Sequence, residues 1–222
     1  MTLDRTPEAL PPAEDRIVGP VVLEGRFVRL DPLSMDHVAA VAAAASGPRE
    51  TYGWTWVPDG PAETEAYLRT ILAEQAAGRG LPFATVSRES GKIVGVTRFF
   101  NIEYWAWPEG NANQRGANLP DAVEIGGTWL SAAAQRTPIN TEAKLLMLRH
   151  AFETWHVHRV RLMTDSRNAR SRAAIERIGG QLDGILRAHT PGSDGAIRDS
   201  AVYSLVDAEW PSVQIRLEAR LA

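Results

Sequence analysis

Hydrophobic residues recur along this chain with the spacing of helices in some segments and with the spacing of strands in others. Apolar side chains stand three and four positions apart in two long segments, at Leu68, Ile71 and Leu72 and at Leu145, Leu148, Phe152 and Trp155. Alternating or continuously apolar stretches predict strands over residues 21–30, 82–88, 92–100, 122–131, 159–165, 184–189 and 198–206. The first of these fits either one strand or a bent hairpin.

Capping and turn residues place helices between these strands. Ser34 can cap the first helix, and a glycine pair at residues 179 and 180 can end the last one. The helices are predicted over residues 35–45, 62–77, 140–155 and 171–178. The resulting order, βααβββαβαββ, predicts an α/β protein with one mixed sheet and helices on its faces.

The first 18 residues differ in composition from the rest of the chain. They are acidic and rich in proline, which predicts a disordered tail rather than a signal or transit peptide. No domain boundary follows, so residues 19–222 are expected to form a single domain with a full hydrophobic core. No apolar stretch is long enough to span a bilayer. These features predict a soluble, cytoplasmic protein with no membrane partner.

Composition also restricts the chemistry. The sequence contains no cysteine, which excludes disulfides, thiolate metal sites and a cysteine nucleophile. A formal net charge of -3 argues against nucleic acid as a partner, although the arginines within residues 159–177 leave a local basic patch open. His156 and His158 lie close together, but no carboxylate has a matching ligand spacing, so we expect no metal.

One strand-to-helix connection has the properties of an anion-binding site. The strand at residues 124–130 leads through a loop at 131–139 into a helix that is expected to start at Asn140 and Thr141. The first turn of a helix presents unpaired N–H groups and a partial positive charge, which suit a pyrophosphate, and Arg136 adds a full charge. An ordinary structural connection is the alternative.

A second strand-to-helix connection carries the pattern N-x-x-S-x-x-x-I-E-R-x-G over residues 168–179. This pattern, preceded by E-I-G at 124–126 and Q-R at 135–136, resembles the coenzyme A site of the GNAT acetyltransferase superfamily. The pairs at 198–199 and 203–204 and the triplet E-W-P at 209–211 are similar to the RimJ/RimL branch of that superfamily. The resemblance covers residues 21–221, nearly the whole predicted domain.

The resemblance implies a GNAT fold, with a central twisted mixed sheet whose middle strands are splayed. It implies an N-acetyltransferase that transfers an acetyl group directly from acetyl-CoA, as co-substrate, to a primary amine. That amine is either a protein N-terminal α-amine or the amine of a small molecule. A homodimer is possible by the same analogy.

Two positions depart from the superfamily pattern. Pro138 and Asn140 stand where the pyrophosphate loop usually has glycines, and proline removes a backbone donor, so we expect an altered cradle. Ile175 stands where many members have a tyrosine that protonates the leaving thiolate. Ser171 is the nearest substitute and is our candidate for that role, although a hydroxyl is a weak acid.

The resemblance also assigns residues to the coenzyme. The thioester would lie along the strand at 124–130, where Gly126 and Gly127 predict a bulge or a close approach of another backbone. A main-chain N–H near Leu130 would hold the carbonyl oxygen, and Arg167, Arg170 or Arg172 could meet phosphates. The predicted coenzyme-binding residues are Trp129, Leu130, Gln135, Arg136, Thr137, Ile139, Asn140, Thr141, Asn168 and Arg172.

The acceptor amine must attack as a neutral base. An α-amine with a pKa of about 7.8 is roughly one-tenth neutral at pH 7, so a carboxylate acting through water can suffice. Glu124 is the candidate general base and Glu103 a weaker one, whereas the structural alternative for Glu124 is a salt bridge. The aromatic residues predicted to bind the acceptor, unless they only anchor loops, are Trp54, Trp56, Tyr104 and Trp105.

Two alternatives stay open at this point. The lost tyrosine and glycines fit a catalytically weak or inactive acyl-CoA-binding module that acts as a sensor or partner. The arginines of residues 159–177 fit a nucleic-acid-binding protein, which the overall charge disfavours.

Overall fold

The computed structural model describes residues 18–116 and 118–222, so the predicted tail lies almost wholly outside the described residues. Within these residues eight strands form one sheet in the order β1-β2-β3-β4-β5-β6-β8-β7. The strands are β1 Leu23–Glu24, β2 Val28–Pro32, β3 Gly80–Ser87, β4 Ile93–Glu103, β5 Ala122–Leu130, β6 Arg159–Asp165, β7 Gln181–Pro191 and β8 Ile197–Val206. All neighbours are antiparallel except β5 and β6, which are parallel, so the predicted mixed α/β sheet is confirmed.

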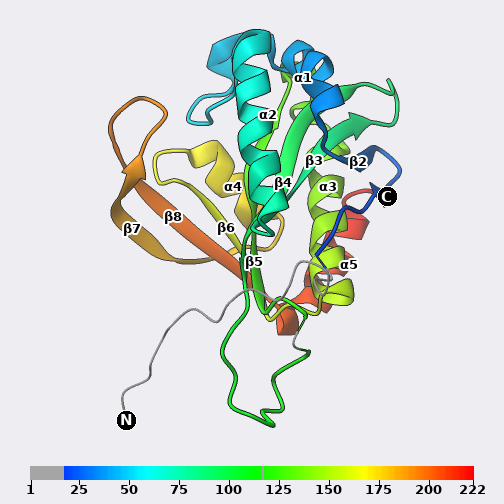
Figure 1. Ribbon diagram of the computed structural model, residues 1–222, viewed down its shortest axis with the longest axis vertical. Coiled ribbons are helices and arrows are strands. Elements are labelled where there is room, and N and C mark those ends of the chain that lie inside the picture. Colours follow the sequence, from blue (N-terminus) through cyan, green and yellow to red (C-terminus); the bar gives the residue numbers. More distant parts are fainter. Residues whose placement is uncertain (1–17, 117) are drawn as a thin grey trace.

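Helices cover both faces of this sheet (Figure 1). They are α1 Val38–Ala45, α2 Gly60–Ala76, α3 Pro138–Arg149, α4 Ala169–Arg177 and α5 Trp210–Ala219. One hydrophobic cluster joins α1 and α2 to the sheet, and a larger cluster joins α3, α4 and α5 to the other face. Strand β3 is buried along its whole length, which explains its continuous run of apolar and small residues.

The central strands β5 and β6 are paired over only three residues. Their register runs from Ala122 opposite Arg159 to Glu124 opposite Arg161, after which no pairing continues. Both strands nevertheless extend further, β5 to Leu130 and β6 to Asp165. In Figure 1 they meet near the bottom of the view and separate above it. The chain therefore has the splayed central strands that the resemblance predicted.

A bulge interrupts β5 at the predicted glycine pair. Val96 of β4 faces Trp129, whereas Arg98 faces Gly126, so one extra residue of β5 fits opposite Thr97. Gly127 has a φ of 57°, a left-handed conformation that glycine adopts at little cost. The bulge turns Trp129 into the cluster beneath α1 and α2 and leaves Thr128 facing α3.

The start of α3 differs from the prediction. The helix begins at Pro138, and Thr137 is its N-cap, so the expected start and cap at Asn140 or Thr141 were wrong. Proline is well suited to this first helical position because its missing N–H has no partner within the helix there. The helix ends at Arg149 and continues as a π-helical turn to Thr154.

Glu142 on α3 fixes the turn between β1 and β2. Its carboxylate accepts hydrogen bonds from the main-chain N–H groups of Arg26 (2.8 Å), Phe27 (2.6 Å) and Val28 (2.8 Å). A Cβ on Gly25 would lie 2.4 Å from this carboxyl group, so the close approach requires glycine. The hairpin alternative for residues 21–30 is therefore the observed one, and it holds the sheet edge against α3.

The last α-helix of the chain was not predicted. Helix α5 follows β8 and buries Trp210, Val213 and Leu217 against the sheet. Its Trp210 indole N–H donates to Glu153 (2.9 Å), which ties the triplet at 209–211 to the end of α3. Those residues therefore have a structural role.

Candidate active site

The open end of the splay is formed by the starts of α3 and α4. The amide of Gln135 donates to the carbonyls of Leu130 (3.0 Å) and Thr51 (3.4 Å). Arg170, at the start of α4, donates to Gln135 Oε1 (3.2 Å) and to the Thr51 carbonyl (2.9 Å). These hydrogen bonds connect the N-termini of two helices across the open end of the splay. The two helices start at Pro138 and Ala169, 31 residues apart in the sequence.

The start of α3 offers few but accessible polar groups. Arg136 is exposed, has a φ of 61°, and makes no hydrogen bond or ion pair with another described residue. Thr137 Oγ1 accepts the N–H of Ile139 (3.4 Å), whose side chain is buried in the core. The side-chain oxygen of Asn140 is buried without a partner among the described residues. Thr141 follows it and is half-buried.

The start of α4 is built by Asn168. Its buried side chain caps the helix by accepting the N–H of Ser171 (2.9 Å). Arg172 donates to the hydroxyl of Tyr203 (2.9 Å) and to the carbonyl of Ser166 (3.4 Å). The hydroxyl of Tyr203 in turn donates to Glu176 (3.0 Å). Arg172 thus already has an internal partner, and its role as a coenzyme ligand stays a prediction.

Arg167 is held by carboxylates on both sides. It donates to Asp165 (2.8 Å) and Asp194 (2.9 Å), and its guanidinium lies 3.9 Å from the ring centroid of Trp54. These contacts raise the pKa of Arg167 and lower that of Asp165, because each stabilises the charged form of its partner. Trp54 therefore packs at the open end of the splay, beside the β7–β8 turn, where Ser193 donates to its carbonyl.

Glu124 is buried at the point where the paired part of β5 and β6 ends. Its side chain is 4% exposed and accepts hydrogen bonds from Asn101 Nδ2 (3.0 Å) and Arg161 Nε (2.8 Å). Arg161 also lies 3.9 Å from Glu103, which in turn accepts from Arg159 (3.4 Å). The salt bridge that sequence analysis gave as the structural alternative is thus present, and the predicted role as general base stays a prediction.

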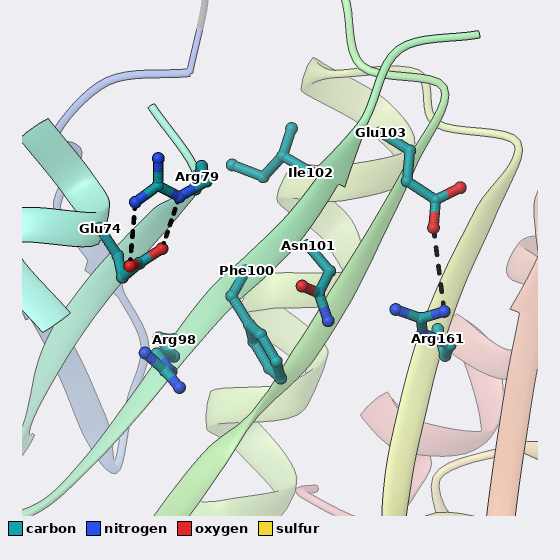
Figure 2. A pocket seen from close by; sticks show the side chains of 8 residues that line it. All are labelled: Glu74, Arg79, Arg98, Phe100, Asn101, Ile102, Glu103 and Arg161. Carbon is teal, nitrogen blue, oxygen red and sulfur yellow. Dashed lines mark hydrogen bonds and ion pairs between the residues drawn. The ribbon is translucent and has the colours of Figure 1, made fainter. Parts of the chain in front are cut away.

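A pocket of about 520 Å³ lies beside this carboxylate, on the sheet face that α2 covers. Figure 2 shows side chains from the end of α2, from β4 and from β6 around it. The lining residues are Glu74, Arg79, Arg98, Phe100, Asn101, Ile102, Glu103 and Arg161. Five of these eight are charged, and a cavity of this size suits a small polar molecule.

The predicted acceptor-binding aromatics are divided between two places. Trp56 is 52% exposed and packs on Tyr67 of α2, with ring centroids 5.5 Å apart. Tyr104 and Trp105 lie beyond the paired end of β5 and β6 instead, where Trp105 stacks on His158. The Trp105 indole also donates to Glu103, which lines the pocket (3.0 Å). The structure does not bring these aromatics together into one clamp.

Two cations beside the bulge were not predicted. Lys144 of α3 is 5% exposed and donates to Thr97 Oγ1 (3.0 Å) and Thr128 Oγ1 (2.6 Å). Burial lowers its pKa to about 7. Its position four residues before Leu148, on the apolar face of the helix, was the available signal. Arg98, the second cation, had no comparable signal.

The comparisons with known proteins agree with this geometry. A family described as an acetyltransferase (GNAT) domain matches residues 28–181. Among solved structures, a GCN5-related N-acetyltransferase from Brucella melitensis is 30% identical, with a TM-score of 0.77, and the match covers 92% of this chain and 86% of that one. RimJ from Mycobacterium smegmatis, solved in complex with CoA-disulfide, is 25% identical, with a TM-score of 0.70 and coverage of 91% and 93%.

A third likeness concerns the fold alone. The ribosomal-protein-S5-alanine acetyltransferase of Vibrio fischeri is 17% identical, with a TM-score of 0.65 and coverage of 86% of this chain and 98% of that one. No match is found among curated proteins. No helix in residues 18–116 and 118–222 is both long and apolar enough to cross a bilayer. The family match, which spans more than half of the sequence, shows that this chain belongs to the GNAT acetyltransferase family.

Proposed function

We propose that this protein transfers the acetyl group of acetyl-CoA directly to a primary amine that enters from the pocket beside Glu124. The observation that carries the proposal is the divergence of β5 and β6 beyond Glu124 and Arg161. Two unpaired strand edges face each other there, and the amide groups of an extended ligand can pair with such edges. The reaction fits a cytoplasmic enzyme, because a chain without cysteine needs no oxidising compartment.

The residues around the splay fit the coenzyme. The N–H of Ser131 donates to Val94 of β4, and hydrogen-bonding direction alternates along a strand, so the N–H of Leu130 points into the splay. That N–H is suited to hold the thioester carbonyl oxygen. At the open end, Arg136, the first turn of α3 and the neighbouring start of α4 suit the phosphates. Acetyl-CoA supplies the activated acyl group.

The reaction needs the amine to lose one proton. The new N–C bond forms as the C–S bond breaks, and the departing thiolate takes up one proton. Asn101 and Arg161 hold the carboxylate of Glu124 in place beside the pocket, where it can orient a water that removes the amine proton. Ser171, half-buried in the first turn of α4, is the proposed proton donor for the thiolate.

Calorimetric titration with acetyl-CoA tests the donor. We expect micromolar binding and a matching rise in the thermal midpoint, with coenzyme A and a nicotinamide dinucleotide as comparisons. Absence of binding at millimolar acetyl-CoA would overturn the proposal. Binding of acetyl-CoA without release of coenzyme A in the presence of any amine would favour the second candidate function, an inactive acyl-CoA-binding module. Pro138 and Ile175, which depart from the superfamily pattern, are consistent with that alternative.

Replacement of Glu124 tests the base. We expect Glu124→Gln to lower kcat at neutral pH about 100-fold, the lower end of what a positioned general base contributes, and to leave acetyl-CoA affinity unchanged. Glu103→Gln replaces the weaker candidate base in the same pocket and shows whether the loss is specific to Glu124. An unchanged kcat in Glu124→Gln would remove that residue from the mechanism.

A further inference from the structure

One cation in the pocket has no partner. Arg98 of β4 makes no hydrogen bond or ion pair with any residue in the described part of the chain, and its Nε is buried and unsatisfied. Its guanidinium lies 4.7 Å from the ring centroid of Phe100. Figure 2 shows the contrast: Arg79 and Arg161 are joined by dashed lines to carboxylates, whereas Arg98 is joined to none.

The neighbouring carboxylates are already paired. Glu74 accepts two hydrogen bonds from Arg79, at 2.7 and 3.0 Å, and Glu124 is paired with Arg161. Arg98 acts on Glu74 only through its charge, by lowering the pKa of that carboxyl group after the larger effect of Arg79. Glu103, the remaining carboxylate of the pocket, accepts from Arg159. Each carboxylate thus has another arginine as its partner, and the charge of Arg98 is in excess, which matches a monoanion.

The position of Arg98 connects the pocket to the predicted reaction point. Its register partner is Gly126, and a Cβ on Gly127 would lie 3.0 Å from Arg98 Nε. The side chain thus lies over the bulge, the part of β5 along which the thioester is expected. Glu124 lies two residues from Gly126 on the same strand, a distance of about 7 Å. A small acceptor could therefore place its anionic group against Arg98 and its amine beside Glu124 when only a few bonds separate the two groups.

Packing alone does not explain an arginine at this position. A buried donor without a partner costs stability, more so when it is charged, and an arginine cannot lose its proton to avoid that cost. A methionine or lysine stem would cover Gly127 equally well. A planar guanidinium held against an aromatic ring is instead the arrangement that binds a carboxylate through two parallel hydrogen bonds.

We propose that Arg98 binds the carboxylate of the acceptor, so that the natural acceptors are α-amino acids rather than amines without an acidic group. This inference rests on the proposed acetyl transfer and specifies its substrate class. The amine of such an acceptor would face Glu124 and the splay while its carboxylate pairs with Arg98. The transfer itself is the same as for any amine: an N–C bond forms, the C–S bond breaks, the amine loses one proton and the thiolate takes one up.

The test compares L-amino acids with their α-carboxamides as acceptors, using full-length protein and acetyl-CoA. Because the chain has no cysteine, a thiol reagent detects only the released coenzyme A. The amine of a carboxamide has a lower pKa than that of the amino acid, because the neighbouring negative charge is gone, and more of it is neutral at pH 7. This difference alone would make the carboxamide the better acceptor, which is the opposite of what the proposal predicts. We expect kcat/KM nevertheless to be at least tenfold higher for the amino acids.

Variants of the pocket arginines assign that preference to one residue. We expect Arg98→Gln to raise the KM for amino acids by about 10- to 100-fold, as expected for loss of a charge-assisted hydrogen bond, with no effect on carboxamides or on acetyl-CoA binding. Arg79→Gln is the matched control, because its partner is Glu74. Equal use of both acceptor classes by the wild type, or an unchanged KM in Arg98→Gln, would overturn the inference.

A separate binding measurement distinguishes this inference from the proposed function. N-acetyl amino acids are the expected products, and they should raise the thermal midpoint of the wild type but not of Arg98→Gln. That result would support carboxylate binding even if acetyl-CoA failed to bind in calorimetry. If acetyl-CoA binds and carboxamides are acetylated, but N-acetyl amino acids bind both forms equally, the acetyl transfer stands and the role of Arg98 is refuted.

Discussion

Lys144 makes folding stability depend on pH in a range where few other groups titrate. Its amine is enclosed between α3 and the bulge, and its hydrogen bonds go to two threonine hydroxyls, Thr97 and Thr128, rather than to a carboxylate. Burial lowers its pKa from 10.5 to about 7. The unfolded chain therefore binds more protons than the folded chain between these values, and stability must rise with pH across that window.

The size of this effect follows from the two pKa values. Between pH 7 and 9 the linkage relation gives a gain of about 2 kcal/mol in the free energy of unfolding. Below about pH 6 the contribution is constant, because the amine is charged in both states. Burial raises the pKa of Tyr67 and lowers that of His150, so their contributions lie outside this window, above about pH 10 and below about pH 6.5 respectively.

Urea unfolding of wild type and Lys144→Met, followed by tryptophan fluorescence at pH 7, 8 and 9, measures the effect. Methionine keeps a similar length and leaves Thr97 and Thr128 to bond with each other, as they already do at 2.8 Å. We expect the wild type to gain about 2 kcal/mol across this range and the variant to gain none.

The matched control for this experiment is Lys92→Met. Lys92 and Lys144 are the only lysines of the sequence, and Lys92 is exposed. The Lys92→Met protein should therefore show the wild-type dependence on pH. A wild-type stability that is constant between pH 7 and 9, or an equal rise in Lys144→Met, would refute the argument that the amine is neutralised by burial.

Three further substitutions test how the site is supported. Glu142→Gln should lose about 2 kcal/mol of stability in urea unfolding, because a neutral amide accepts three main-chain N–H groups less well than a carboxylate; an unchanged midpoint would contradict this. Asn168→Ala should cost about 1 kcal/mol and speed hydrogen exchange in the first turn of α4; unchanged exchange would argue against the cap. Gly95→Ala should cost about 3 kcal/mol or more, because the new Cβ would lie 2.1 Å from the Trp129 carbonyl, whereas Gly184→Ala, with no atom within 4 Å, should be tolerated.

The regular elements and the bulge could be predicted because their signals are local. Strand β6 was predicted with its observed bounds, since its apolar residues alternate and a turn follows it. The glycines at 126 and 127 marked the bulge because only a residue without a Cβ adopts its backbone conformation readily. Helix α5 was missed even though Trp210, Val213 and Leu217 have helical spacing.

The partners of the charged residues could not be predicted, because they come from distant parts of the sequence. Arg172 was interpreted as a phosphate ligand from its place in a motif, yet its hydrogen bond goes to Tyr203, which is 31 residues away. The salt bridge of Glu124 spans 37 residues. Whether a cation has a carboxylate nearby is a property of the folded chain, so Arg98 could not be distinguished from an ordinary paired residue beforehand, whereas Lys144 could be singled out only by its place on the apolar face of its helix.

Arg98 and Lys144 lie on opposite faces of the bulge, and neither has an ion-pair partner among the described residues. Burial disfavours the charged form of both side chains, but only one of them can lose its proton. A lysine can give up its proton, and the pKa of about 7 shows that burial drives Lys144 towards the neutral amine that two hydroxyls can satisfy. Arginine keeps its charge at any pH that proteins tolerate, so the charge of Arg98, which lines the pocket without an ion-pair partner among the described residues, is available to an anion. The same observation, an unpaired cation beside the bulge, therefore indicates a structural amine in one case and a ligand-binding group in the other.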